Sequence, residues 1–180
     1  MKWINTILFT SLLLATACLS SKKAMKIDFK VAKDEKKDGH KMLVGIINRA
    51  MLQNDTAFGW FKENSQYGLP DATAVKTFRL QKAKFSMVVF GGTWCEDTQN
   101  LLPKFYQLLD ASGYPESQIT LIAVDRKKET IHNLHTTYHI NNVPTFIVLK
   151  DGKEAGRVVE YGTMGDITKE LGMMVARLEK

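Results

Sequence analysis

One cysteine, Cys95, lies where a polypeptide can make a thiol reactive. It belongs to the segment GGTWCEDT at residues 91–98, which follows the apolar run FSMVVF. Apolar side chains recur at helical spacing over residues 98–111, so we expect Cys95 between a buried strand and the start of a helix. The free amide groups at a helix start favour the thiolate, which is the nucleophilic form of cysteine. Glu96 and Asp97 carry the same charge as the thiolate and oppose its formation, so we expect moderate activation.

The position three residues after Cys95 is occupied by Thr98 rather than by a second cysteine. In a C-x-x-C site the second thiol attacks the mixed disulfide and releases the bound molecule. Thr98 has no such chemistry, but its hydroxyl can donate a hydrogen bond to the Cys95 thiolate, and it can cap the helix. Trp94 either covers the sulfur and offers an apolar contact to a partner or packs at the end of the strand. The pattern therefore indicates a site built around one thiol.

The N-terminus has the pattern of an export signal. After Lys2, the apolar stretch Ile4–Ala17 is too short to span a bilayer comfortably and is typical of a signal peptide. The small residues ATA then precede Cys18, which resembles the lipobox of bacterial lipoproteins, in which the chain is cut before the cysteine and the thiol is lipidated. An ordinary cleaved signal peptide or an uncleaved anchor is the alternative. We therefore predict a signal peptide over residues 1–17, lipidation at Cys18 and a location in the cell envelope, facing the periplasm.

Composition and charge are those of an ordinary globular chain with a basic balance. The 180 residues are 44% hydrophobic, and 25 basic against 19 acidic residues give a formal charge of +6. This content predicts one domain with a core, over residues 40–180. Lysines and acids are interspersed over residues 19–39, so residues 18–39 are predicted to form the lipid anchor and a solvated tether, with adhesion to anionic head groups as the alternative. The sequence lacks aromatic interleaving and a nucleic-acid-binding motif, so no nucleic acid is expected as a partner.

Periodicity predicts an α/β domain. An amphipathic helix is expected over residues 41–53, followed by an irregular aromatic loop, FGWF and YGLPD, and by Asp71 as the N-cap of the next helix. Buried strands and a hairpin then alternate with helices, which predicts a mixed central sheet with helices on both faces and an N-terminal helical extension. The expected strands are 85–90, 119–125, 145–150 and 156–161, and the expected helices are 72–83, 98–111, 129–139 and 166–178.

Three motifs together resemble the thioredoxin superfamily. They are Trp94–Cys95 at the start of a helix, Val143–Pro144–Thr145, and the hairpin KDGK, in this order over roughly residues 70–180. The resemblance implies a thioredoxin-like three-layer α/β/α fold and thiol–disulfide exchange without a cofactor. It also implies a cis bond before Pro144, which exposes the backbone of Val143 so that an extended client pairs with the segment Val143–Pro144–Thr145. The implied partner of the monomeric protein is a protein client with a cysteine or disulfide, or a low-molecular-weight thiol.

The chain also departs from the pattern of this superfamily. Val89 stands where the family commonly carries a buried acid used in proton transfer, and Leu121 stands about where a basic partner is often found. Together with Thr98, these residues replace three groups that the family uses to resolve the mixed disulfide: the second thiol, the buried acid and its basic partner. We therefore predict a monothiol thiol–disulfide oxidoreductase, in which Cys95 forms a mixed disulfide that an external thiol resolves. The alternative is a non-catalytic client-binding or chaperone module that keeps the client groove.

Three histidines are spaced so that two or three could share a helix face and bind a metal. They are His132, His135 and His139. The sequence places no carboxylate or second cysteine clearly to complete such a site, so no metal is expected. A metal carrier that uses Cys95 and the histidines is the remaining alternative.

Overall fold

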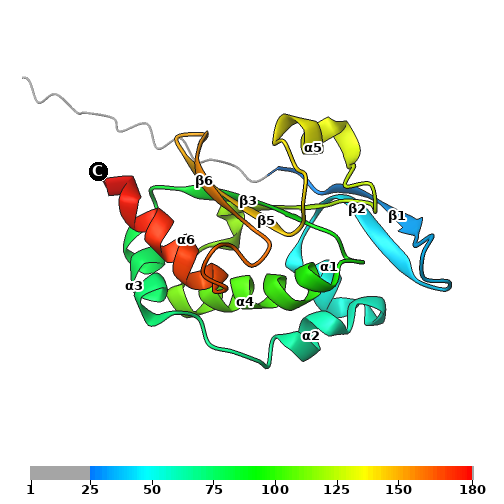
Figure 1. Ribbon diagram of the computed structural model, residues 1–180, viewed down its shortest axis with the longest axis horizontal. Coiled ribbons are helices and arrows are strands. Elements are labelled where there is room, and N and C mark those ends of the chain that lie inside the picture. Colours follow the sequence, from blue (N-terminus) through cyan, green and yellow to red (C-terminus); the bar gives the residue numbers. More distant parts are fainter. Residues whose placement is uncertain (1–24, 180) are drawn as a thin grey trace, which may run out of the picture.

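The computed structural model describes residues 25–179, so the predicted signal peptide and Cys18 lie outside the described residues. Within residues 25–179, six strands form one mixed sheet in the order β1-β2-β4-β3-β5-β6 (Figure 1). β3 and β4 are parallel, and the other neighbouring pairs are antiparallel. The strands are β1 (Asp28–Lys33), β2 (Lys41–Ile47), β3 (Ser86–Gly91), β4 (Ile119–Ala123), β5 (Thr145–Lys150) and β6 (Lys153–Val159).

Helices cover both faces of this sheet, which gives the predicted three layers. α1, α2, α3, α4 and α6 lie on one face, and α5 lies on the other (Figure 1). The α-helices are α1 (Arg49–Asn54), α2 (Trp60–Asn64), α3 (Ala72–Gln81), α4 (Glu96–Ser112), α5 (Leu134–Thr137) and α6 (Ile167–Ala176). Short 3₁₀ helices span Thr56–Phe58, Glu116–Gln118, Ile131–Asn133 and Arg177–Glu179.

Side chains of the central strand β3 alternate between two cores. Met87 and Val89 belong to the larger core, which packs against α3, α4 and α6, whereas Val88 and Phe90 belong to the core on the side of α5. Because both faces are buried, the strand appears in the sequence as an uninterrupted apolar run. This strand leads directly into the loop that carries Cys95.

The helix α4 carries Cys95 as its N-cap and ends at Gly113, which adopts a left-handed conformation with φ of 64°. Pro103 lies inside this helix and has no N–H to donate to the carbonyl of Gln99. The side-chain amide of Asn64, at the end of α2, donates to that carbonyl at 2.9 Å. α2 therefore satisfies the acceptor that the proline leaves open in the helix of the site.

The N-terminal region differs from the prediction, because two segments predicted as a tether and a helix form a β-hairpin. Asp28–Lys33, inside the predicted tether, is β1, and Lys41–Ile47, inside the predicted helix 41–53, is β2. β2 lies between β1 and β4, and residues 42–47 are buried, so the run has no polar face from which its period could be read. Only α1 is helical within 41–53, and its N-cap Asn48 accepts a hydrogen bond from the amide of Met51.

Two further predictions are wrong in part. FGWF lies in a 3₁₀ helix and in α2 rather than in an irregular loop. The predicted helix 129–139 is α-helical only in α5, because His132 and Asn133 adopt left-handed conformations with φ of 54° and 52°. Asp71 is the N-cap of α3, as predicted, and accepts a hydrogen bond from the amide of Ala74 at 2.8 Å. Within residues 25–179 the helices are too short or too polar to cross a membrane.

Candidate active site

Cys95 is a free, partly exposed thiol at the N-terminus of the 17-residue helix α4. Its backbone is extended, with φ of −90° and ψ of 125°, and its carbonyl accepts the first hydrogen bond of the helix, from the amide of Gln99. The thiol donates a hydrogen bond to the backbone carbonyl of Val143, with 3.3 Å between Sγ and the oxygen. The helix start and the loop before β5, which the sequence separates by nearly fifty residues, therefore meet at the sulfur.

The loop opposite Cys95 has the predicted cis bond between Val143 and Pro144. The side chain of Val143 is buried, and the carbonyl of Pro144 accepts a hydrogen bond from the amide of Glu160 at 2.7 Å. Thr145 is also buried, and its hydroxyl donates to the carbonyl of Asn142 at 2.7 Å. The side chain of Thr145 thus shapes the loop, and the proposed contact of this segment with a client stays a prediction.

Thr98 is buried, and its role differs from the one expected. Its hydroxyl oxygen accepts a hydrogen bond from the amide of Gly92 at 3.2 Å. Among the described residues no hydrogen bond joins Thr98 to the Cys95 sulfur. A Cβ at Gly91 would lie 2.8 Å from the methyl group of Thr98, so this threonine packs tightly against the end of β3. Thr98 therefore stabilises the conformation of the loop before Cys95 rather than contacting the sulfur through a hydrogen bond.

Trp94 is held in place from two sides. Its indole N–H donates to the carbonyl of Val124 at 3.0 Å, and the guanidinium carbon of Arg126 lies 4.9 Å from its ring centroid, in a cation–π contact. A Cβ at Gly92 would lie 2.7 Å from the indole, so the ring also packs closely on the backbone. The side chain beside the nucleophile is therefore held by two residues that follow β4, Val124 and Arg126.

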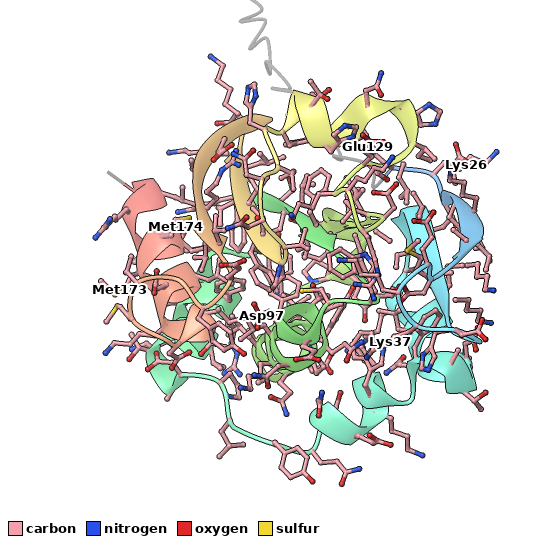
Figure 2. All side chains as sticks on the ribbon, turned by 45° about the vertical axis from the view of Figure 1, so that its right-hand side comes forward. Lys26, Lys37, Asp97, Glu129, Met173 and Met174 are labelled. Carbon is pink, nitrogen blue, oxygen red and sulfur yellow. The ribbon has the colours of Figure 1, made fainter. Side chains whose placement is uncertain are left out.

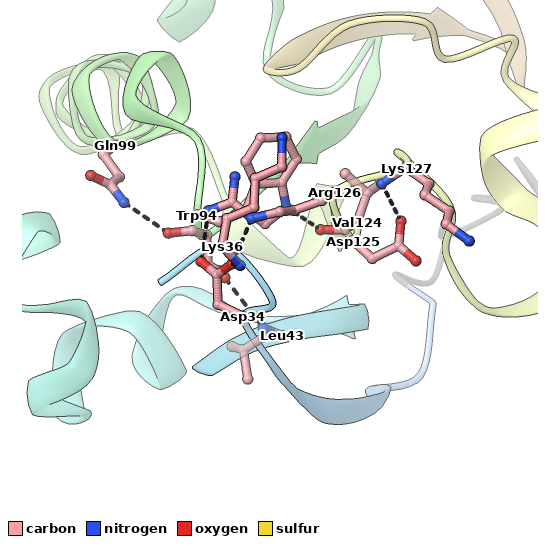
Figure 3. Close-up of polar contacts among 10 residues, drawn as sticks. Asp34, Lys36, Leu43, Trp94, Gln99, Val124, Asp125, Arg126 and Lys127 are labelled. Atoms are coloured by element: carbon pink, nitrogen blue, oxygen red, sulfur yellow. Dashed lines mark hydrogen bonds and ion pairs between the residues drawn. The ribbon is translucent and has the colours of Figure 1, made fainter. Parts of the chain in front are cut away.

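Arg126 is bound in turn by Asp34, in the turn between β1 and β2. Nε and Nη2 of Arg126 lie 2.5 and 2.8 Å from the two carboxylate oxygens of Asp34 (Figure 3). The side chain of Asp34 is buried, and its hydrogen bond to Arg126 lowers its pKa to about 2. The backbone amide of Leu43 in β2 donates to the hydroxyl of Thr93 at 3.2 Å. The N-terminal hairpin thus contacts the loop that carries the thiol, through Thr93, and the segment after β4, through Arg126.

Cys95 opens onto a shallow pocket of about 320 Å³ with charges of both signs. Its lining comprises Lys37, Trp94, Cys95, Glu96, Asp97 and Arg126. Lys37 belongs to the hairpin and Asp97 to α4, and Figure 2 labels both. The pKa of Arg126 is raised, mainly by its hydrogen bond to Asp34, with a smaller electrostatic contribution from Cys95. The predicted residues Trp94, Glu96 and Asp97 therefore do surround the thiol, together with Lys37 and Arg126, which the sequence did not point to.

Val89 and Leu121 lie side by side in the parallel register of β3 and β4. Both are buried in the larger apolar core. The two positions that the resemblance assigns to an acid and its basic partner are thus neighbours, and in this chain both carry apolar side chains that pack in the core.

The three histidines do not share a helix face. His132 pairs with Asp28, with 2.8 Å between Nε2 and the carboxylate, and Nδ1 of His135 accepts the amide of Thr130 at 3.2 Å. His139 lies beyond the end of α5 and is exposed. Within the described part of the chain, no group of three or more His, Cys, Asp or Glu side chains could hold a metal ion.

The strand–helix–strand–helix–hairpin–helix order, with a thiol at the helix start opposite a cis-proline loop, defines a thioredoxin-like protein. The Thioredoxin family profile matches residues 72–172, and the chain belongs to this family. β1, β2, α1 and α2 precede the matched residues.

Two relatives and one solved structure show the extent of the similarity. The chain is 30% identical to Thioredoxin-2 of Pyricularia oryzae over 80 residues, which cover 44% of this chain and 43% of that protein. It is 29% identical to Thioredoxin H-type of Oryza sativa subsp. indica over 86 residues, which cover 48% of this chain and 66% of that protein. The reduced thioredoxin pre-protein of Schistosoma mansoni is 26% identical, with a TM-score of 0.39, and the match covers 62% of this chain and 94% of that one. The chain thus spans less than half the length of the first relative.

Proposed function

We propose that the protein is a monothiol thiol–disulfide oxidoreductase that acts through Cys95. The observation that carries this proposal is the position of the thiol, which is partly exposed at the N-terminus of a long helix and opens onto a charged pocket. Unsatisfied amides and the helix dipole favour an anion at such a position. Membership of the thioredoxin family supports disulfide exchange as the reaction.

The reaction has two exchange steps. The Cys95 thiolate attacks one sulfur of a client disulfide, which forms a mixed disulfide and releases the other client sulfur as a thiolate that takes a proton from solvent. An external thiolate then attacks the client sulfur of the mixed disulfide, forms a new disulfide with the client and releases the Cys95 thiolate. The external thiol comes from a low-molecular-weight compound or from the client itself. The pair of steps needs no other oxidant or reductant.

The second step is assigned to an external thiol because the site offers none of its own. Thr98 is buried and bonded to Gly92, and Val89 supplies no carboxylate for proton transfer. Cys18 is the other cysteine of the chain, and we propose that it carries a lipid that holds the protein at the cell envelope, facing the periplasm. Labelling cells with a fatty-acid analogue tests this proposal: label and membrane association are lost in Cys18→Ser, and retention of both in that variant contradicts lipidation.

The activity is tested on the full chain in a Cys18→Ser background, so that Cys95 is its single cysteine. Insulin is supplied as the disulfide client and glutathione as the external thiol, and mixed disulfides are identified by mass spectrometry. We expect a Cys95-linked intermediate and turnover that disappears in Cys95→Ser. If the Cys95→Ser variant retains full activity on every disulfide that the parent protein turns over, the proposal fails.

The alternative, a non-catalytic client-binding or chaperone module, is supported by the apolar Val89–Leu121 pair, which removes charges used in turnover. It predicts a slowly reacting thiol and equal binding of unfolded polypeptides by the parent protein and Cys95→Ser. Rapid labelling of Cys95 by a thiol reagent at neutral pH contradicts it.

A further inference from the structure

The turn that joins β1 and β2 contributes one buried carboxylate to the neighbourhood of the thiol. Within residues 34–40, Asp34 is buried, with 2% of its surface exposed, and the other six residues are exposed. Its carboxylate accepts hydrogen bonds from the amide of Lys36 at 3.0 Å and from Arg126. This turn precedes residues 72–172, which match the thioredoxin family, yet it contributes a side chain beside the site.

Arg126 connects this carboxylate to the thiol site. Two of its nitrogen atoms, Nε and Nη2, bind Asp34, and its guanidinium lies over the ring of Trp94, next to Cys95 in the sequence. Arg126 also lines the pocket of Cys95, and an electrostatic interaction with Cys95 contributes to the raised pKa of the arginine. A cation that lines the same pocket as a thiol favours the thiolate over the thiol. Asp34 opposes part of this effect, because its charge is opposite and it is bonded to the same guanidinium.

A second arginine makes a similar cluster at a distance from the thiol. Arg49 bonds Asp110 at 2.8 Å and Glu116 at 2.6 Å, and its guanidinium lies 4.9 Å from the ring centroid of Tyr106. Asp110 lies near the end of α4, whose 1.5 Å rise per residue puts it about 22 Å from Cys95. The chain therefore contains a matched ion pair with the same ring contact, far from the thiol.

We propose that Arg126 is the electrostatic partner of the Cys95 thiolate and that Asp34, a positioning residue, sets how strongly the arginine acts. This inference deepens the proposed function, because it rests on a reactive Cys95. The other charges that face the pocket are Lys37 from the hairpin and Glu96 and Asp97 from α4. The loop on the opposite side presents the carbonyl of Val143 to the sulfur. Arg126 thus offsets the two carboxylates at the helix start.

The test measures the alkylation rate of Cys95 by iodoacetamide, a neutral reagent, across pH on the full chain with Cys18→Ser. We expect Arg126→Gln to react roughly 3- to 10-fold more slowly at pH 7, because an opposite charge no longer stabilises the thiolate. Asp34→Asn keeps one acceptor for the arginine but removes the negative charge, so it should react roughly 2- to 3-fold faster. Near pH 10, where thiols are mostly ionised, the rates should converge, whereas a change in access to the sulfur would persist there.

Three controls make the result decisive. Arg49→Gln and Asp110→Asn remove the matched pair and should leave the alkylation profile unchanged. Arg126→Lys keeps the charge without the planar fork, so it should stay within about 2-fold of the parent rate even if it is as destabilised as Arg126→Gln. Circular dichroism confirms that each variant is folded at the temperature of the assay.

The inference is overturned if Arg126→Gln matches Arg49→Gln, if Asp34→Asn reacts more slowly than the parent, or if the differences persist near pH 10. Its failure is distinguishable from failure of the proposed function, because alkylation needs no disulfide substrate. Rates that shift as expected in a protein that exchanges no disulfide keep this inference and refute the oxidoreductase. Normal Cys95-dependent disulfide exchange, together with an unchanged alkylation profile in Arg126→Gln, refutes this inference and keeps the oxidoreductase.

Discussion

The side chain of Asn64 is expected to stabilise α4, because it donates a hydrogen bond to the carbonyl of Gln99, which Pro103 leaves without a donor in the helix. The carbonyl has no intrahelical donor, since residue 103 lacks an N–H, and Asn64 donates to it at 2.9 Å in a partly buried position. Leaving such an acceptor unsatisfied costs about 1–2 kcal/mol. Asn64→Ala should therefore lower the free energy of unfolding by about that amount. Asn54→Ala, at an exposed position of α1, is the matched control and should have a small effect.

A double-mutant cycle separates this bond from other effects of the substitution. Pro103→Ala supplies a backbone N–H for the same carbonyl, so the cost of Asn64→Ala should fall by about 1 kcal/mol in that background. The assay is equilibrium unfolding in urea of the parent, both single variants and the double variant, with the slopes compared to confirm the same cooperative transition. An equal cost of Asn64→Ala in both backgrounds would refute the reasoning, because the asparagine would then do something other than satisfy the carbonyl freed by the proline.

Three more predictions follow from the site and its hairpin. Above about pH 4 the parent should be more stable than Asp34→Asn by up to about 2 kcal/mol, reduced by the screening of water at the turn. This difference should shrink as the pH falls from 3.8 towards 2, because a lowered pKa stabilises the fold only while the carboxylate is ionised. Urea unfolding at a series of pH values measures the difference, and a value that stays constant contradicts the prediction. Thr98→Cys should form a disulfide with Cys95 but reduce insulin more slowly than an ordinary C-x-x-C thioredoxin, because Val89 offers no carboxylate; an equal rate shows that this position is not a missing proton relay. Gly45→Ala should destabilise the hairpin by about 2 kcal/mol or more, since the φ of Gly45 is 126° and a Cβ there would clash with the backbone oxygen of Asp28 in β1. Gly59→Ala is the control and should be nearly neutral in thermal unfolding, because its Cβ would lie 3.5 Å from the nearest atom, the carbonyl oxygen of Thr56.

The sequence predicted the parts of the fold whose polarity pattern is local. β5 has the predicted bounds, and α4 and α6 lie within a few residues of theirs, because each helix has one apolar face and clear end signals. The hairpin could not be recognised in the same way. β2 is buried on both faces, and a fully buried strand shows the same short apolar run as a buried helix.

The site was predictable only as far as its motifs reach. The resemblance named Cys95 and the cis bond before Pro144, and the structure has this bond and places the carbonyl of Val143 against the sulfur. Asp34 had no distinguishing signal, since it stands among lysines and acids that remain exposed. Its partner Arg126 lies 92 residues away, so only the pairing of β1 and β2 with the rest of the sheet shows that this carboxylate differs from its neighbours.

If Cys18 carries a lipid, the position of β1 in the sheet also limits the distance between the domain and the membrane. If Cys18 carries a lipid, the chain between it and Asp28, where β1 begins, extends to about 35 Å at most, whereas a tether reaching to residue 40 would extend to about 75 Å. In that case the hairpin reduces the maximum length of the chain between the lipid and the domain to less than half. A domain held this close would search a thin layer above the bilayer, and disulfides that enter that layer would meet Cys95 at a higher effective concentration than those in the wider compartment.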